Sequence, residues 1–235
     1  MKILVGIDDT DTLDSPGTNQ VARAVVSELG AEFHCLRIVR HQLFFDSRIP
    51  YTSKNSSCSL LFTSTLPAES ALSVLQERFR EALLRRFQPG SDPGLCLTYA
   101  VTQPVIDFGK CCQSEVTTQA EARDLARQGG LFLDGLGGTE DGVIGALAAV
   151  GLAATENDGR VVQIGQQPDD VSNVQTVAFL KERGVQQVCC EDQTLSNGTV
   201  DVGKHLRPNL RNGKIILFVE PDEDHESDWR AVRKL

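Results

Sequence analysis

The chain alternates short apolar runs with longer segments whose apolar residues recur at helical spacing, and this alternation constrains the fold more than any other feature. Residues 2–7 form an apolar run typical of a buried strand. Val21, Val25 and Leu29 then recur every four residues, and Gly30 follows as a helix stop. The alternation predicts an α/β fold.

The same alternation continues along the rest of the chain. Further strands are expected at 33–39, 58–62, 95–101, 160–165, 185–190 and 214–220, and further helices at 68–87, 114–128 and 170–183. Composition and loops change most around 155–170, which favours a boundary between two parts of the chain there.

Charge and cysteine content exclude several classes of protein. With 32 acidic and 23 basic residues the net charge is -9, which disfavours broad electrostatic binding to nucleic acid or to an anionic membrane. The chain has no apolar run of membrane-spanning length and no signal-peptide pattern, so we expect a soluble cytoplasmic protein. Its seven cysteines contain no C-x-x-C pair, so no structural zinc is expected.

An acidic loop follows the first predicted strand directly. Asp8, Asp9 and Asp11 lie within four positions, and Thr10 and Thr12 add hydroxyl oxygens. Such oxygen ligands suit Mg²⁺, which takes one or two carboxylates together with substrate phosphates. The alternative is a solvated turn in which the aspartates act as caps and turn formers.

A glycine-rich run lies further along, before a helix of small residues. Its glycines let a backbone approach phosphate closely, and a helix start offers N–H groups to anions. The run lacks the G-K-[ST] of a P-loop and the spacing of a dinucleotide fingerprint, so a flexible loop or close helix packing stays open. With the acidic loop, the run suggests a metal and nucleotide phosphates. The glycines are Gly135, Gly137, Gly138, Gly142 and Gly145.

Four sequence blocks in one order identify a family resemblance. They are "GIDDTD" (Gly6–Asp11), "IPYTSKN" (Ile49–Asn55), "DPGLCL" (Asp92–Leu97) and "GVIGALAAVG" (Gly142–Gly151). Together they resemble the archaeal agmatinylcytidine synthetases, which modify an isoleucine tRNA. The resemblance implies a kinase-like domain that uses ATP and Mg²⁺ to phosphorylate a cytidine of the tRNA before agmatine replaces the phosphate.

The resemblance also implies roles for individual residues. Asp8, Asp9 and Asp11 would hold the metal, and the Gly137–Gly145 loop would lie near the phosphates. Thr18 falls where the family has a threonine pair, a candidate phosphate acceptor; its alternative role is a helix N-cap.

Lys54 falls where the family has a basic pair. It could stabilise phosphate charge during transfer, and its alternative role is a solvated loop lysine. Weaker candidates are His41, Arg48, Asp107 and Asp134.

The chain also departs from the family. The "IPYTSKNSS" block lacks the arginine and glycine that precede Asn55 in the family, and no family pattern aligns beyond about residue 165. The oligonucleotide-binding domain and zinc ribbon of the family are not present in the sequence. We therefore expect no tight nucleic-acid binding by this chain alone, and no membrane partner.

These observations lead to one expected architecture and three candidate functions. We expect a kinase-like α/β domain over residues 1–155, followed by a smaller ferredoxin-like α+β domain over 156–235. The leading function is Mg-ATP binding with phosphoryl transfer to an unidentified acceptor. The alternatives are a non-catalytic nucleotide-binding or interaction module, and a tRNA-modifying subunit that works with a separate RNA-binding partner.

Overall fold

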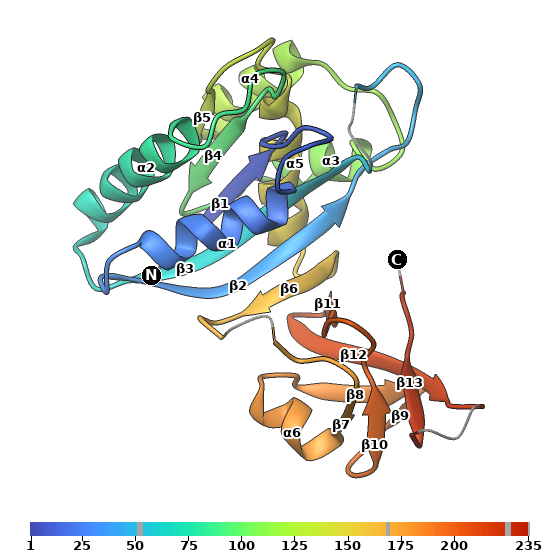
Figure 1. Ribbon diagram of the computed structural model, residues 1–235. Helices are drawn as coiled ribbons and strands as arrows, with labels where there is room; N and C mark the ends of the chain where they lie inside the picture. Colours follow the sequence, from blue (N-terminus) through green and yellow to red (C-terminus); the bar gives the residue numbers. More distant parts are fainter. Residues whose placement is uncertain (51–53, 168–169, 224–226, 235) are drawn as a thin grey trace.

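The computed structural model describes residues 1–50, 54–167, 170–223 and 227–234 and shows a mixed α/β protein, as expected (Figure 1). The helices are α1 (Thr18–Glu28), α2 (Ala68–Leu84), α3 (Gln103–Cys111), α4 (Gln119–Gly129), α5 (Gly142–Ala154) and α6 (Val177–Glu182). The strands are β1 (Lys2–Asp8), β2 (Phe33–Gln42), β3 (Ser56–Ser64), β4 (Gly94–Thr98), β5 (Phe132–Gly135), β6 (Arg160–Ile164), β7 (Val174–Thr176), β8 (Gln187–Cys190), β9 (Gln193–Thr194), β10 (Thr199–Asp201), β11 (Asn209–Arg211), β12 (Lys214–Pro221) and β13 (Trp229–Ala231).

The N-terminal part is a sheet with helices on both faces. Its strands run in the order β5-β4-β1-β3-β2-β6, and every pairing among these six strands is antiparallel. Helices α1 and α2 cover one face, and α3 and α5 lie on the other (Figure 1). Central β1 therefore lies between two helical layers, which explains its unbroken apolar sequence.

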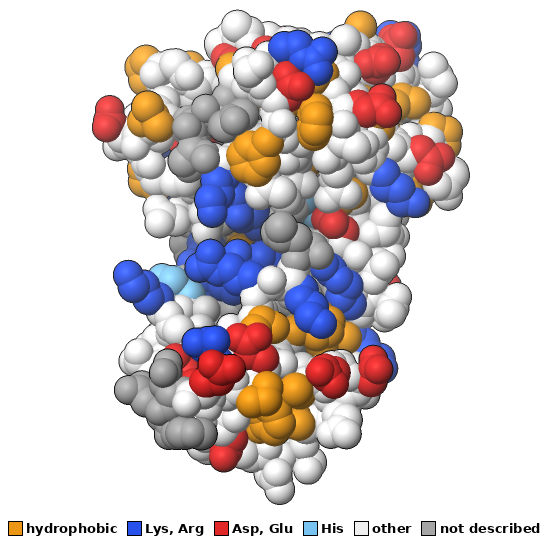
Figure 2. Space-filling model, turned by 90° about the vertical axis from the view of Figure 1, so that its right-hand side faces the viewer, with side chains coloured by type: hydrophobic (Ala, Val, Ile, Leu, Met, Phe, Trp, Pro, Cys, Tyr) orange, Lys and Arg blue, Asp and Glu red, His pale blue; other side chains and the backbone are white. Residues whose placement is uncertain are grey.

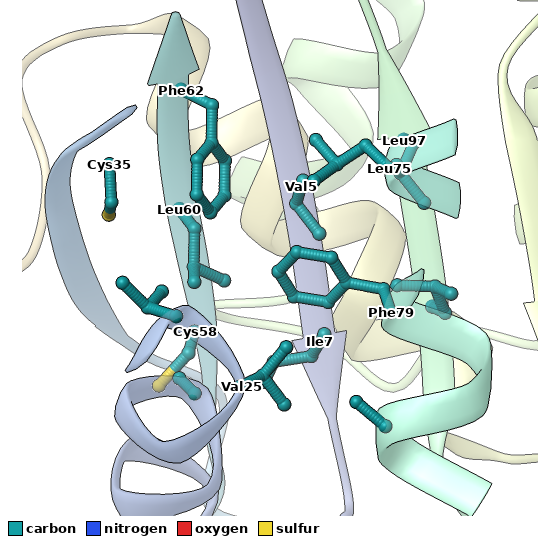
Figure 3. Packing of buried hydrophobic residues seen from close by; sticks show 14 of the residues in the cluster. Val5, Ile7, Val25, Cys35, Cys58, Leu60, Phe62, Leu75, Phe79 and Leu97 are labelled. Atoms are coloured by element: carbon teal, nitrogen blue, oxygen red, sulfur yellow. The ribbon is translucent and has the colours of Figure 1, made fainter. Parts of the chain in front are cut away.

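Alternate residues of β1 face the two helical layers. Val5 and Ile7 point toward α1 and α2, where they pack near Val25 and Phe79 (Figure 3). The ring of Phe79 meets that of Phe62 edge-on, with the centroids 5.8 Å apart. The apolar core on this face of the sheet is the larger of the two cores of the N-terminal part.

The opposite face of β1 lies very close to α5. A Cβ atom at Gly6 would collide with the carbonyl oxygen of Ala146, and one at Gly94 of β4 would collide with the backbone of Gly142. On its other side α5 approaches α3 equally closely, because a Cβ at Gly151 would meet the Val105 carbonyl. Eleven of the 13 residues of α5 are buried, so its small side chains serve close packing.

Two expected helices differ from those observed. The segment 114–128 is helical only from Gln119, because Thr118 and Glu121 form a capping box that begins α4 there. The segment 170–183 contains β7 and then the short α6, whose N-cap Thr176 accepts a hydrogen bond from the N–H of Phe179. Helix α3 was not predicted at all.

The C-terminal part is built around β12, which pairs with β11, β13 and β8. Val177, Leu180, Val188 and Leu217 belong to its apolar core. The sheet path continues from β6 to β11 through one residue pair. Because β6 also pairs with β2, it connects the two parts, and the division at residue 155 stays a prediction.

A buried polar network supports this connection. The ring of His41 in β2 makes two hydrogen bonds, between Nδ1 and Asp158 Oδ2 (2.6 Å) and between Nε2 and Ser59 Oγ of β3 (2.7 Å). His41 and Ser59 are buried and line none of the cavities described below, so the network is structural.

Among the described helices, none combines the length and apolarity that a membrane span requires.

The contact between β1 and α5 predicts a strong effect of one added methyl group. Gly6→Ala is expected to lower the melting temperature by roughly 3 to 10 °C, because neither the strand nor the helix backbone can yield without loss of packing. Gly17→Ala is the control, since only the side chain of Asn19 lies near its new Cβ. Thermal unfolding followed by circular dichroism measures both. Equal melting temperatures for Gly6→Ala and the wild type would contradict this packing.

Candidate functional site

A cavity of about 170 Å³ opens where β1 ends and α5 begins. The acidic loop, the start of α1 and the first turn of α5 form much of its wall, together with Leu43, residues 48–50 and 54–56, and residues of the segment 112–117. The sequence blocks around residues 6–11 and 142–151 thus meet in space. Residues 51–53 of the "IPYTSKN" block lie outside the described residues.

Asp8 lies in this wall at the end of β1. A Cβ at Gly145 would occupy the place of the Asp8 carboxylate, so the glycine makes room for it beside the first turn of α5. Burial, with a further contribution from the negative charge of Asp9, raises the pKa of Asp8 well above its usual value. The sequence therefore places a carboxyl group where its ionisation is unfavourable in the protein alone.

Asp9 follows in a left-handed backbone conformation, with φ of 49°. Its carbonyl oxygen accepts a hydrogen bond from the N–H of Asp92 (3.1 Å), which fixes the loop to the segment before β4. Burial and the charges of Asp92, Asp11 and Asp141 raise the pKa of Asp9 to about 7. A cation beside these carboxylates would lower that pKa.

Thr18 and Asp11 form a hydrogen-bonded pair in the same wall. The Thr18 hydroxyl donates to Asp11 Oδ1 (2.7 Å) and accepts from the Thr10 hydroxyl (3.2 Å). Gly17, and not Thr18, occupies the N-cap position of α1. The Thr18 hydroxyl therefore faces a carboxylate that can take its proton, instead of capping the helix.

The glycine-rich run divides into two groups. Gly142 and Gly145 line the cavity. The other three, Gly135, Gly137 and Gly138, are absent from its lining. An added Cβ would meet the side chain of Glu140 at Gly135, that of Phe87 at Gly137 and that of Asp92 at Gly138.

Asp92 holds the second group in place. Its carboxylate accepts hydrogen bonds from the N–H and the hydroxyl of Thr139, at 2.6 and 2.9 Å. Gly138 is in a left-handed conformation, with φ of 63°. This part of the run is a packed turn, and only the start of α5 approaches the cavity.

Basic side chains also line the cavity. Lys54 is exposed and lines the cavity. Arg48 also lines it but donates to Asp46 at 2.7 Å. His41, Asp107 and Asp134 do not line the cavity. Asp107 accepts a hydrogen bond from Gln103, and Asp134 pairs with Arg80. Lys54 and Arg48 are thus the sequence-predicted cations that line the same cavity as the carboxylates.

The donor set fits a cation that is only partly coordinated by protein. Among the described residues, no three His, Cys, Asp or Glu side chains are arranged to hold a metal ion by themselves. The buried carboxyl of Asp8 and the crowded one of Asp9 fit Mg²⁺, which takes one or two carboxylates and completes its shell with water and phosphate oxygens.

Sequence reasoning missed Asp141, which lines the cavity. Its carboxylate accepts a hydrogen bond from Gln119 of α4 at 2.6 Å. Its position directly before the small-residue helix, where it forms the N-cap of α5, is the sequence feature that could have indicated this residue. In the sequence, Asp92 stands out only as part of a block that resembles the family.

Comparisons with known proteins show the fold. No family model matches the chain, and no curated protein matches it significantly. Solved structures that are similar over 64% of the chain include a tRNA fluorescent labeling enzyme (22% identity, TM-score 0.55) and complexes of TiaS with an isoleucine tRNA and ATP (23%, 0.52) or with that tRNA, AMPCPP and agmatine (21%, 0.53). The chain spans 36% of the length of each.

TiaS is an agmatidine synthetase for an isoleucine tRNA, so the resemblance expected from the sequence blocks is supported at the level of the fold. Identities this low carry the fold and no residue roles.

The pKa of Asp9 predicts how stability depends on pH. Its folded-state pKa of about 7 lies above the usual 3.8, so the unfolded chain releases a proton that the folded protein keeps, and stability falls as pH rises between these values. In EDTA, Asp9→Asn should melt close to the wild type near pH 4 and about 3 °C or more above it at pH 8.

The matched control for this measurement is Asp14→Asn, an exposed aspartate of the same loop. Its melting temperature should follow that of the wild type across the pH range. A difference between Asp9→Asn and the wild type that does not change with pH would contradict the assignment.

Proposed function

We propose that the cavity at the end of β1 binds Mg-ATP and that the protein is a phosphotransferase. The observation that carries the proposal is the meeting, in one cavity, of the crowded carboxyls of Asp8 and Asp9 with the start of α5 and Lys54. Carboxylates alone would repel a nucleotide, so a divalent cation is needed between the two.

Each element has a role in this proposal. Asp8 and Asp9 hold Mg²⁺, whose charge offsets their repulsion. The positive end of α5 faces the phosphates, and Gly145 leaves the room beside it in which the Asp8 carboxylate lies. The N–H groups of Gly142 and Ile144 already donate to Asp92 and Asp141 carbonyls, so the helix acts through its dipole. Lys54 stabilises charge on the transferred group.

The hydrogen bond from Thr18 to Asp11 supplies an acceptor and a base. In the transfer step the Thr18 oxygen forms a bond to the γ-phosphorus, the bond from that phosphorus to the ADP oxygen breaks, and the Thr18 proton passes to Asp11. A separate substrate hydroxyl beside Asp11 would react in the same way. Thr18 is the acceptor that the chain itself provides.

The similar structures support ATP as the nucleotide. TiaS is seen in complexes that contain ATP and AMPCPP. Those complexes also contain tRNA, but this chain spans about a third of the length of TiaS, so a tRNA-modifying role stays with the alternative of a separate RNA-binding partner.

The metal role of Asp8 is tested by binding. In isothermal titration, Asp8→Asn is expected to weaken Mg-ATP binding about tenfold or more, because a ligand of the metal is lost. Asp14→Asn should bind as the wild type does, and EDTA should abolish the difference. The same Mg²⁺-dependent affinity in Asp8→Asn and the wild type would show that Asp8 holds no metal.

The acceptor role of Thr18 is tested by intact-mass measurement after incubation with Mg-ATP. The wild type should gain the mass of one phosphoryl group, Thr18→Ala should not, and Thr12→Ala in the same loop should behave as the wild type. Phosphorylation retained in Thr18→Ala would overturn the role of Thr18. If the protein binds Mg-ATP but transfers no phosphoryl group to itself or to an added acceptor, the result would favour the non-catalytic module.

A further inference from the structure

A second cavity, of about 280 Å³, adjoins the first and differs from it in charge. Asp11, Thr18, Lys54 and Ser56 line both cavities and form their shared wall. The second cavity continues from this wall toward β6 and the segment before β11. A ligand in it would therefore lie on the other side of the Thr18–Asp11 pair from the proposed nucleotide.

Four cationic side chains surround this second cavity. Arg40 comes from β2, Arg160 from β6, Arg207 from the segment before β11, and Lys54 from the shared wall. Figure 2 shows Lys and Arg side chains gathered between the upper and lower parts of the molecule. Burial and the positive charges of Arg233, Arg40 and Arg207 lower the pKa of Arg160.

The positive charges exceed the negative ones around this cavity. Asp11 is its one acidic lining residue within the described part of the chain, and Asp11 accepts the Thr18 hydrogen bond. Arg40 donates through Nε to Ser56 (2.9 Å), and Arg207 donates through Nη1 to the Leu206 carbonyl (2.7 Å). The Ser56 hydroxyl carries no charge, so its bond orients the Arg40 guanidinium group without neutralising it. A cluster of this kind is costly unless an anion binds to it.

The start of α1 adds to the same field. Gly17, Thr18 and Asn19 line the cavity, and the first turn of α1 carries no acidic residue. The positive end of the helix therefore reinforces the arginines. Phosphate matches this arrangement in charge and in geometry, since guanidinium groups bind its oxygens in pairs.

We propose that the second cavity binds a phosphate group of the separate acceptor whose hydroxyl would lie beside Asp11 and react in place of that of Thr18, and that this acceptor is a small phosphorylated compound such as a sugar phosphate or mononucleotide. The inference rests on the proposed phosphotransferase function. A compact cavity between the two parts of the chain suits one phosphate, whereas a net charge of -9 opposes a polyanion that extends over the surface.

Direct binding without ATP or Mg²⁺ tests the inference. In isothermal titration, inorganic pyrophosphate and ribose 5-phosphate should bind the wild type and ribose should not. Arg160→Gln and Arg207→Gln should each weaken phosphate binding about tenfold or more, because a charged hydrogen-bond donor is lost. Asp8→Asn should not weaken phosphate binding, since Asp8 lines the first cavity and not the second.

Two measurements serve as controls. Arg230→Gln removes an exposed arginine of β13 that pairs with Glu220, so phosphate binding should not change. Melting temperatures show whether the variants fold. If Arg160→Gln is unstable, Arg40→Gln replaces it, because Arg40 lines the second cavity and not the first.

The outcomes separate this inference from the proposed function. Mg-ATP binding that depends on Asp8, without phosphate binding that depends on Arg160 and Arg207, would overturn the inference alone. Arginine-dependent phosphate binding without any Mg-ATP binding would overturn the phosphotransferase function, and the acceptor assignment with it. A short single-stranded RNA that binds through Arg160 where ribose 5-phosphate does not would replace the small acceptor with RNA.

Discussion

The close contact between β1 and α5 is the interaction on which the rest of the structure depends. It requires glycine at position 6, because any side chain there would collide with the helix backbone at Ala146. The contact brings the start of α5 to the end of β1, and Gly145 leaves space there for the carboxyl of Asp8. The same packing that buries the sheet therefore also builds the acidic wall of the cavity.

A second cavity, lined mainly by basic side chains, adjoins this acidic one. The raised pKa values of Asp8 and Asp9 and the lowered pKa of Arg160 have one physical origin, since burial and like charges disfavour the ionised form of each. A cation in the first cavity and an anion in the second would relieve both. Because Thr18 and Asp11 lie in the shared wall, the chemistry that we propose takes place where these two fields meet.

Pattern reading succeeded where elements are long. The strands β1, β2 and β3 and the helices α1 and α2 were all predicted, because each carries several apolar residues at a clear period. Strands of two or three residues in the C-terminal part are too short to show a period and were missed. The strands on both sides of β1 are antiparallel to it, and the acidic loop meets the start of α5 in the cavity.

The sequence by itself determined the mixed α/β class and the position of the acidic loop after a buried strand, because both depend on residues that are neighbours in the chain. The tertiary structure alone decided that Gly142 and Gly145 line the cavity, whereas Gly137 and Gly138 pack against Phe87 and Asp92. It also brought together Arg40, Arg160 and Arg207, which share no motif. Local patterns record the periodicity of the backbone, whereas a meeting of distant side chains depends on strand order and on how closely the helices pack.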